Sequence, residues 1–193
     1  MAAKYPYRTS TFFDTSLFHI NSVQLIPANP LEKTDSAFLH GNFLISDFLN
    51  NFVAIIGRND FRVKWLYYQS ESYMGQHAAR MLDDGRIMFF VNNLHDSTGH
   101  LYSAVRIIDP VSKNVVWEYS GTPAKSMQSV SQGYCQYLRN GNVLITVNNY
   151  VVSGKRYVIE VTPDKRVVWQ WTPHQLQNNL AQEDFYRVER HEK

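Results

Sequence analysis

Residues 141–149 read GNVLITVNN and residues 157–169 read YVIEVTPDKRVVW, and this stretch decides the fold. Two short segments rich in Val and Ile follow a Gly-led turn, and a polar turn separates them from a third segment that ends in Trp169. Short segments of this composition, bounded by Gly, Asn, Asp and Pro, are typical of β-strands. The stretch therefore predicts successive antiparallel strands joined by turns.

The same pattern occurs three times along the chain. Trp65, Trp117 and Trp169 recur at intervals of 52 residues and close the segments FRVKW, KNVVW and KRVVW. Gly-led apolar runs precede them, namely GNFLIS, GRIMFF and GNVLIT. Self-similarity at this period, with about four strands in each unit, is typical of a β-propeller, in which the recurring Trp would pack between blades. We expect the repeats at about 17–67, 76–119 and 132–171, with a C-terminal tail at 172–193.

The number of repeats is small for a propeller. Three units and an N-terminal strand make about three to three and a half blades, whereas propellers usually contain about four to eight. We therefore expect residues 1–193 to form a single, partial propeller domain with four-stranded antiparallel blades. Residues 27–39 have no counterpart in the other copies and are expected to form an inserted surface loop, and helical periodicity is confined to residues 174–185.

Composition excludes several classes of protein. Hydrophobic residues make up 44% and aromatic residues 14% of the chain, which is a globular composition. The formal net charge is +2 without a block of basic residues, so neither a nucleic-acid nor a membrane footprint is expected. Cys135 is the single cysteine, which excludes an intrachain disulfide and a thiolate metal cluster. The N-terminal MAAKYPYRTS lacks the apolar core of a secretory signal, and the compartment stays open.

Two histidines hold comparable places in the repeats. His77, in MGQHAAR, lies eight residues before Gly85, and removal of the inserted loop brings His19 into the same register. Asn21 follows two residues after His19, so strand alternation places it on the same face. The first strand of a propeller blade lines the central channel, so these side chains are expected near one rim. A histidine beside apolar strands is usually a core residue, so at this point each histidine could be either a core residue or a functional residue.

Other kinds of site have little support in the sequence. No HxH, HExxH or carboxylate cluster accompanies these histidines, so no metal site is predicted. The GxSxG turn of a serine hydrolase is absent as well. Asn92 and Asn93 are interpreted as residues that cap or turn the chain, and no cofactor motif is found.

The chain resembles the C-terminal half of the bacterial-type arylsulfotransferase family over roughly residues 17–190. The HxNS and QH elements are fairly specific to that family, whereas the NGNxLI and EVTPxxxVVW elements also occur in other propellers. The segments that carry the resemblance are FHINSVQL, FLISDFLNNFVAI, GQHAARMLDDGRIMFFVNN, YLRNGNVLITVNN, YVIEVTPDKRVVWQW and EDFYRVER.

The resemblance implies a six-bladed propeller, often periplasmic or secreted, that transfers a sulfuryl group from a phenolic sulfate ester to a phenol. A channel histidine becomes a transient sulfohistidine, and no nucleotide sulfate donor is used. On this chain the nucleophile would be His77, while His19 and Asn21 would bind the sulfuryl oxygens and assist the leaving phenolate. The implied partners are the sulfate donor, the phenol acceptor, and missing blades or another chain that completes the ring.

The sequence also departs from the family pattern. The family carries an arginine two residues after the serine of its LIS element, a strong donor to anions, and Phe48 stands at that position. Asp47 adds a negative charge beside it, and Val91 replaces the aspartate before the family's Asn. A non-catalytic propeller module that binds a partner or ligand is therefore the alternative to an enzyme.

Overall fold

The computed structural model describes residues 17–70, 75–149, 155–172, 185 and 187–191. Within these residues the chain is all-β, apart from the short 3₁₀ helices η1 (Pro30–Lys33) and η2 (Ser36–Phe38). The strands are β1 (Ile20–Leu25), β2 (Phe43–Asp47), β3 (Phe52–Ile56), β4 (Val63–Tyr68), β5 (Gln76–Met81), β6 (Ile87–His95), β7 (Leu101–Ile108), β8 (Val115–Tyr119), β9 (Tyr134–Tyr137), β10 (Val143–Asn149), β11 (Lys155–Val161) and β12 (Val167–Trp171).

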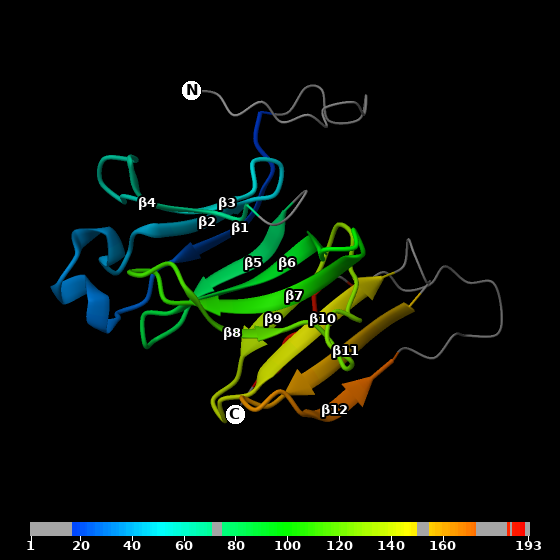
Figure 1. The fold of residues 1–193 in the computed structure, drawn as a ribbon. Coiled ribbons are helices and arrows are strands. Elements are labelled where there is room, and N and C mark those ends of the chain that lie inside the picture. The colour runs from blue at the N-terminus through cyan, green and yellow to red at the C-terminus, as the bar shows by residue number, and fades with distance from the viewer. Residues whose placement is uncertain (1–16, 71–74, 150–154, 173–184, 186, 192–193) are drawn as a thin grey trace.

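The strands form three four-stranded antiparallel sheets that follow one another in chain order (Figure 1). The first sheet contains β1 to β4, the second β5 to β8 and the third β9 to β12, each with its strands in sequence order. The prediction of an all-β chain with four-stranded antiparallel sheets is confirmed. The three sheets do not close into a ring in the part of the chain that is described.

The core lies between the sheets, and the alternation of side chains on β6 explains how. Ile87, Phe89 and Val91 belong to the apolar cluster shared with the first sheet. Met88 and Phe90 belong to the cluster shared with the third sheet. Because successive side chains of a strand point to opposite faces, an uninterrupted apolar run fits a sheet that is covered on both sides.

The recurring tryptophans connect each sheet to the next. The indole nitrogen Nε1 of Trp65 donates to the carbonyl oxygen of Pro110 at 2.8 Å, and Nε1 of Trp117 donates to that of Pro163 at 2.9 Å. Trp65 is 8% exposed, whereas Trp169, in the third sheet, is 43% exposed. The predicted packing between sheets therefore holds at the first position. Trp169 differs because no described sheet follows the third one.

A glutamine side chain also connects neighbouring sheets near their first strands. Gln24 on β1 accepts from the backbone nitrogen of Met81 at 2.7 Å and donates to its carbonyl at 3.2 Å. Gln136 on β9 makes the same pair of bonds, at 2.8 and 2.9 Å, with the backbone of Arg190. Residues 187–191 therefore contact β9 as β5 contacts β1.

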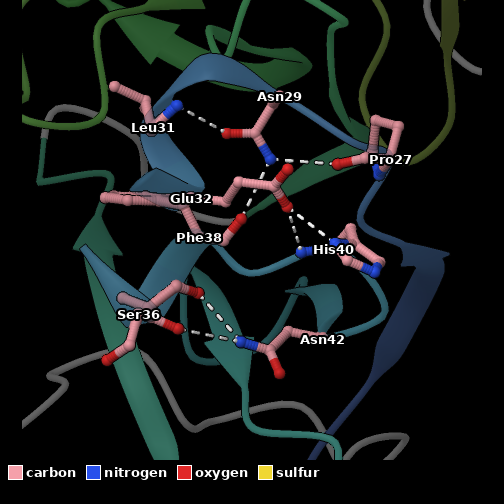
Figure 2. Close-up of polar contacts among 9 residues, drawn as sticks. Pro27, Asn29, Leu31, Glu32, Ser36, Phe38, His40 and Asn42 are labelled. Carbon is pink, nitrogen blue, oxygen red and sulfur yellow. Dashed lines mark hydrogen bonds and ion pairs between the residues drawn. The ribbon is translucent and has the colours of Figure 1, made fainter. Parts of the chain in front are cut away.

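The segment 27–39 is largely exposed, as the sequence predicts, but part of it also reaches the core. Phe38 is 1% exposed, and its ring centroid lies 6.3 Å from that of Trp65. Asn29 caps η1 by accepting from the backbone nitrogen of Leu31, and its amide donates to the carbonyls of Pro27 and Phe38 (Figure 2). These bonds satisfy backbone groups of the insertion, and its buried residues Ala37 and Phe38 reach the core.

Two further observations concern helical structure. The helical periodicity predicted at residues 174–185 lies outside the described residues, with the exception of Phe185. Within the described ranges, no helix is long and apolar enough to cross a membrane.

Candidate functional site

His77 is the second residue of β5 and is held there by a β-bulge. It pairs with Phe90 on β6, and the register then shifts before Arg80 pairs with Met88. Ala78, directly after His77, has a φ of 55°, a left-handed conformation that is uncommon for residues other than glycine. Bulges re-aim the neighbouring side chain and are often found next to active sites. The local backbone thus sets the direction of the imidazole.

The His77 ring is partly buried and hydrogen-bonded. Its Nδ1 atom lies 2.7 Å from Oδ1 of Asn92 on β6. Burial lowers the pKa of His77 from its ordinary 6.5 to about 4; the bond to Asn92 raises this pKa and nearby His19 lowers it. Desolvation disfavours the charged imidazolium, so the ring is neutral at physiological pH.

Phe48 brings the two histidines of the site together. Its ring centroid lies 5.2 Å from that of His77 and 5.6 Å from that of His19. The Phe48 ring is 5% exposed and packs on Gly75, where an added Cβ atom would lie only 1.9 Å from Cδ2 of Phe48. A buried aromatic ring thus occupies the position of the family arginine, with both imidazoles beside it.

Asn21 reaches the same site from β1. Its Nδ2 atom donates to the backbone carbonyl of Gln76 at 2.6 Å, next to His77 in the chain. Ser46 Oγ donates to the same carbonyl at 3.0 Å. The Oδ1 atom of Asn21 is buried and has no hydrogen-bond partner among the described residues. The structure therefore places all three predicted site residues near the start of β5.

The predicted common register of His19 and His77 is wrong. Ser22 faces Ser46 on β2, and His77 faces Phe90 on β6, where both partners lie five residues after their Gly. The position of His77 in the first sheet is therefore that of Ser22. A register shift between Ile20 and Ser22 adds one residue at Asn21, and His19 lies exposed, just before β1. His19 reaches the site from the neighbouring sheet instead.

Asp47 has a structural role in the turn after β2. Its carboxylate accepts from the backbone nitrogens of His19 at 3.2 Å and of Asn50 at 2.9 Å. The Asn50 side chain donates to the same carboxylate at 3.2 Å. These bonds fix the backbone on which both His19 and Phe48 are carried.

Asn92 is the site residue that the sequence interpretation missed. It is fully buried and contacts His77 directly, whereas it was expected only to cap or turn the chain. A signal was present, because Asn92 lies two residues after Phe90, the partner of His77. Residues in this diagonal relation share a face of the sheet and come within reach of one another.

A separate groove of about 650 Å³ lies between the far end of β5 and β9. Its lining includes Arg80, Met81, Tyr134, Gln136 and Glu189, and His77 does not belong to it. Among the described residues, no group of three His, Cys, Asp or Glu side chains could hold a metal ion.

Acid is expected to destabilise the protein through His77. The unfolded chain binds a proton at this group below pH 6.5 and the folded chain only below about pH 4, so stability falls as the pH falls through this window. The loss at pH 4.5 is about 2 to 3 kcal/mol. Urea unfolding at pH 7 and 4.5 measures it: His77→Gln should lose that much less stability than wild type. An equal loss in both proteins contradicts the depressed pKa.

Comparisons with known proteins assign the chain to a family. None of the curated proteins matches the chain. A solved structure of a protein of unknown function from Bacteroides caccae has a TM-score of 0.52 and 19% sequence identity. The match covers 69% of this chain and 46% of that chain, so this chain spans less than half the length of that protein. The family model described as Arylsulfotransferase (ASST) matches residues 5–175, and the chain therefore belongs to the arylsulfotransferase family.

Proposed function

We propose that the chain is an arylsulfotransferase-type protein that moves a sulfuryl group from a phenolic sulfate ester to a phenol through a sulfohistidine at His77. The observation that carries this proposal is the His77 imidazole itself, which is neutral at pH 7 and lies next to His19 and Phe48. A neutral imidazole is a competent nucleophile. Membership of the family supports the same class of reaction.

The reaction proceeds in two displacements at sulfur, in which the same nitrogen of His77 is first the nucleophile and then the leaving group. A ring nitrogen of His77 attacks sulfur, an N–S bond forms, and the S–O bond to the aryl group breaks, with the electron pair leaving on the phenolate. The phenolate takes a proton and departs as a phenol. The oxygen of a second phenol then attacks sulfur and loses its proton, while the N–S bond breaks and the electron pair returns to His77. The two substrates therefore use the site in turn.

His19 and Asn21 supply the polar groups that this chemistry needs. The exposed His19 ring, beside Phe48, gives a proton to the leaving phenolate and recovers one from the acceptor. The amide of Asn21 carries two hydrogens, of which one is used by the Gln76 carbonyl. The second hydrogen binds a sulfuryl oxygen, where negative charge builds up in the transition state.

The three sheets are proposed to be three blades of a six-bladed propeller. The repeated Trp–Pro bonds and the Gln24–Met81 bonds support this arrangement, because they join successive sheets. The bonds of Gln136 to Arg190 repeat the Gln24 pattern on the third sheet. The Bacteroides caccae protein, about twice as long as the matched region, is consistent with further blades. These blades come from the remainder of a longer protein or from another chain.

A non-catalytic binding module is the second candidate, and Phe48 favours it. The ring is buried at the position where the family carries an anion donor. A site without that guanidinium holds a sulfate ester less strongly, since charge-assisted bidentate bonds are among the strongest hydrogen bonds in proteins. Such a module would keep the scaffold and bind a partner instead of turning over an ester.

Turnover distinguishes the two candidates. Purified protein is mixed with a chromogenic aryl sulfate and a phenol acceptor, and released phenol and the sulfated acceptor are quantified. Intact-mass measurement after exposure to the donor alone detects an added SO₃ group. The proposal expects both products and the adduct. A folded protein that yields neither supports the non-catalytic candidate.

Restoring a cation at position 48 is expected to strengthen sulfate binding. The guanidinium in Phe48→Arg would lie beside both imidazoles and form charge-assisted bonds worth about 1.5 to 3 kcal/mol, or roughly 10- to 100-fold in affinity. Calorimetric titration with inorganic sulfate measures this gain. Phe48→Gln, of similar length but uncharged, is the control and should gain little. Equal affinities in the two variants would show that position 48 does not face the anion.

A further inference from the structure

We propose that Asn92 is a positioning residue that holds the proton of His77 on Nδ1 and leaves Nε2 as the nucleophilic atom. The inference rests on the proposed function for its catalytic meaning. The tautomer of His77 itself can be tested without any measurement of turnover.

The orientation of the Asn92 amide follows from its partners. Nδ2 of Asn92 donates to the backbone carbonyl oxygens of Ser129 at 2.7 Å and of Gln132 at 2.8 Å. Carbonyl oxygens only accept, so the NH₂ group must occupy this side of the amide. Oδ1 therefore points to His77, where it lies 2.7 Å from Nδ1.

The tautomer of His77 then follows from hydrogen counting. The amide oxygen of Asn92 also only accepts, so Nδ1 of His77 must be the donor. A neutral imidazole carries one N–H, and the lone pair is then on Nε2. The depressed pKa of His77 is consistent with a ring that stays neutral in this arrangement.

The two carbonyls that orient Asn92 are themselves fixed. Ser103 Oγ donates to the Ser129 carbonyl at 3.0 Å and accepts from the Ser129 nitrogen at 2.9 Å. The Ser129 hydroxyl, which has a single hydrogen, lies within hydrogen-bond distance of the carbonyl oxygens of both Gln132 and Asn148. The loop before β9 is thus tied to both β7 and β10. A flip of the Asn92 amide would set its oxygen against two carbonyl oxygens in a buried site, which is strongly unfavourable.

The experiment observes the ring nitrogens of His77 directly. Protein with ¹⁵N-labelled histidine is studied at pH 7 by two-bond ¹H–¹⁵N correlation, and His77→Gln assigns the signals by their loss. The wild type should show a protonated Nδ1 and an unprotonated Nε2. A wild-type ring with its proton on Nε2 would overturn the inference without any reference to activity.

Two matched variants test the role of Asn92. Asn92→Leu removes the acceptor, so the Nε2–H tautomer should appear, with kcat reduced on the order of 10²- to 10⁴-fold and KM little changed, as expected for a wrongly protonated catalytic histidine. Asn92→Asp keeps an acceptor for Nδ1, should keep the Nδ1–H tautomer and should raise the pKa of His77. Its second oxygen faces the carbonyls of Ser129 and Gln132, so this variant should also lose stability. Asn93→Asp is the control. Asn93 donates to the neighbouring Val130 carbonyl at 2.7 Å, so this variant loses a similar contact with the loop and should leave the His77 signals unchanged.

The outcomes separate this inference from the proposed function. A wild-type tautomer in Asn92→Leu contradicts the positioning role. If Asn92→Leu does not fold, the tautomer of the wild type decides, together with the pKa change in Asn92→Asp where that variant folds. If the protein has the expected tautomer but shows neither turnover nor the adduct, the positioning of His77 by Asn92 is supported and the proposed enzymatic function is contradicted.

Discussion

Replacement of His77 with alanine is expected to abolish sulfuryl transfer and the SO₃ adduct together. The imidazole is the nucleophile of the first displacement and the leaving group of the second, and removal of a covalent nucleophile costs on the order of 10⁴-fold or more in kcat. Wild type and His77→Ala are compared for phenol release and, separately, for the mass of the protein after exposure to donor alone. The adduct should be absent from the variant even after long exposure.

Two other histidines serve as comparisons for this result. His40 lies directly after the insertion 27–39, its Nδ1 contacts Glu32 at 2.7 Å, and His40→Ala should retain full activity. His19→Ala should still form the adduct, more slowly, because it loses the proton donor and not the nucleophile. An adduct that persists in His77→Ala and disappears in His19→Ala would reassign the nucleophile to His19.

Gly75→Ala is expected to lower the free energy of unfolding by about 2 to 4 kcal/mol. Gly75 has a φ of 80°, which residues with a Cβ rarely adopt, and the added Cβ would lie 1.9 Å from Cδ2 of the buried Phe48 ring. The ring must move to relieve the overlap, and it carries its contacts with His19 and His77 along. Denaturant unfolding at pH 7 measures the loss of stability.

Two controls separate the backbone cost from the overlap. Gly99 has a φ of 83° and nothing within 4 Å of an added Cβ, so Gly99→Ala should lose only about 1 kcal/mol. In a Phe48→Ala background the overlap is gone, and Gly75→Ala should then cost about as much as Gly99→Ala. Equal losses for Gly75→Ala and Gly99→Ala in the wild-type background would contradict the packing of Phe48 on Gly75.

The strands could be predicted from the sequence because their cause is local. Val143 to Asn149 and Ile87 to Val91 are rich in β-branched or aromatic residues and are bounded by Gly-led turns, so composition and turns decide them without reference to distant residues. The place of His77 at the start of a first strand follows in the same way. Local sequence composition and turns thus predict the strands and the place of one site residue, His77.

The rest of the site depends on contacts that no local pattern encodes. Ser22, three residues after His19, takes the place in the first sheet that His77 has in the second, and so His19 falls outside the predicted register. The role of Asn92 depends on two carbonyls about 40 residues away, at Ser129 and Gln132. Phe38 shows the same limit, because a segment that reads as a polar loop carries one aromatic ring that the core accepts.

The glutamine bonds at the first strands of two sheets have a consequence for how further sheets can be added. A primary amide presents the same donor and acceptor as a peptide group, so Gln24 and Gln136 each place one rung of a β-ladder on a side chain. One rung fixes the height of the next sheet and leaves its tilt to the packing of side chains. A further sheet would then need only to present one backbone residue to Gln136, and in this chain Arg190 occupies that position.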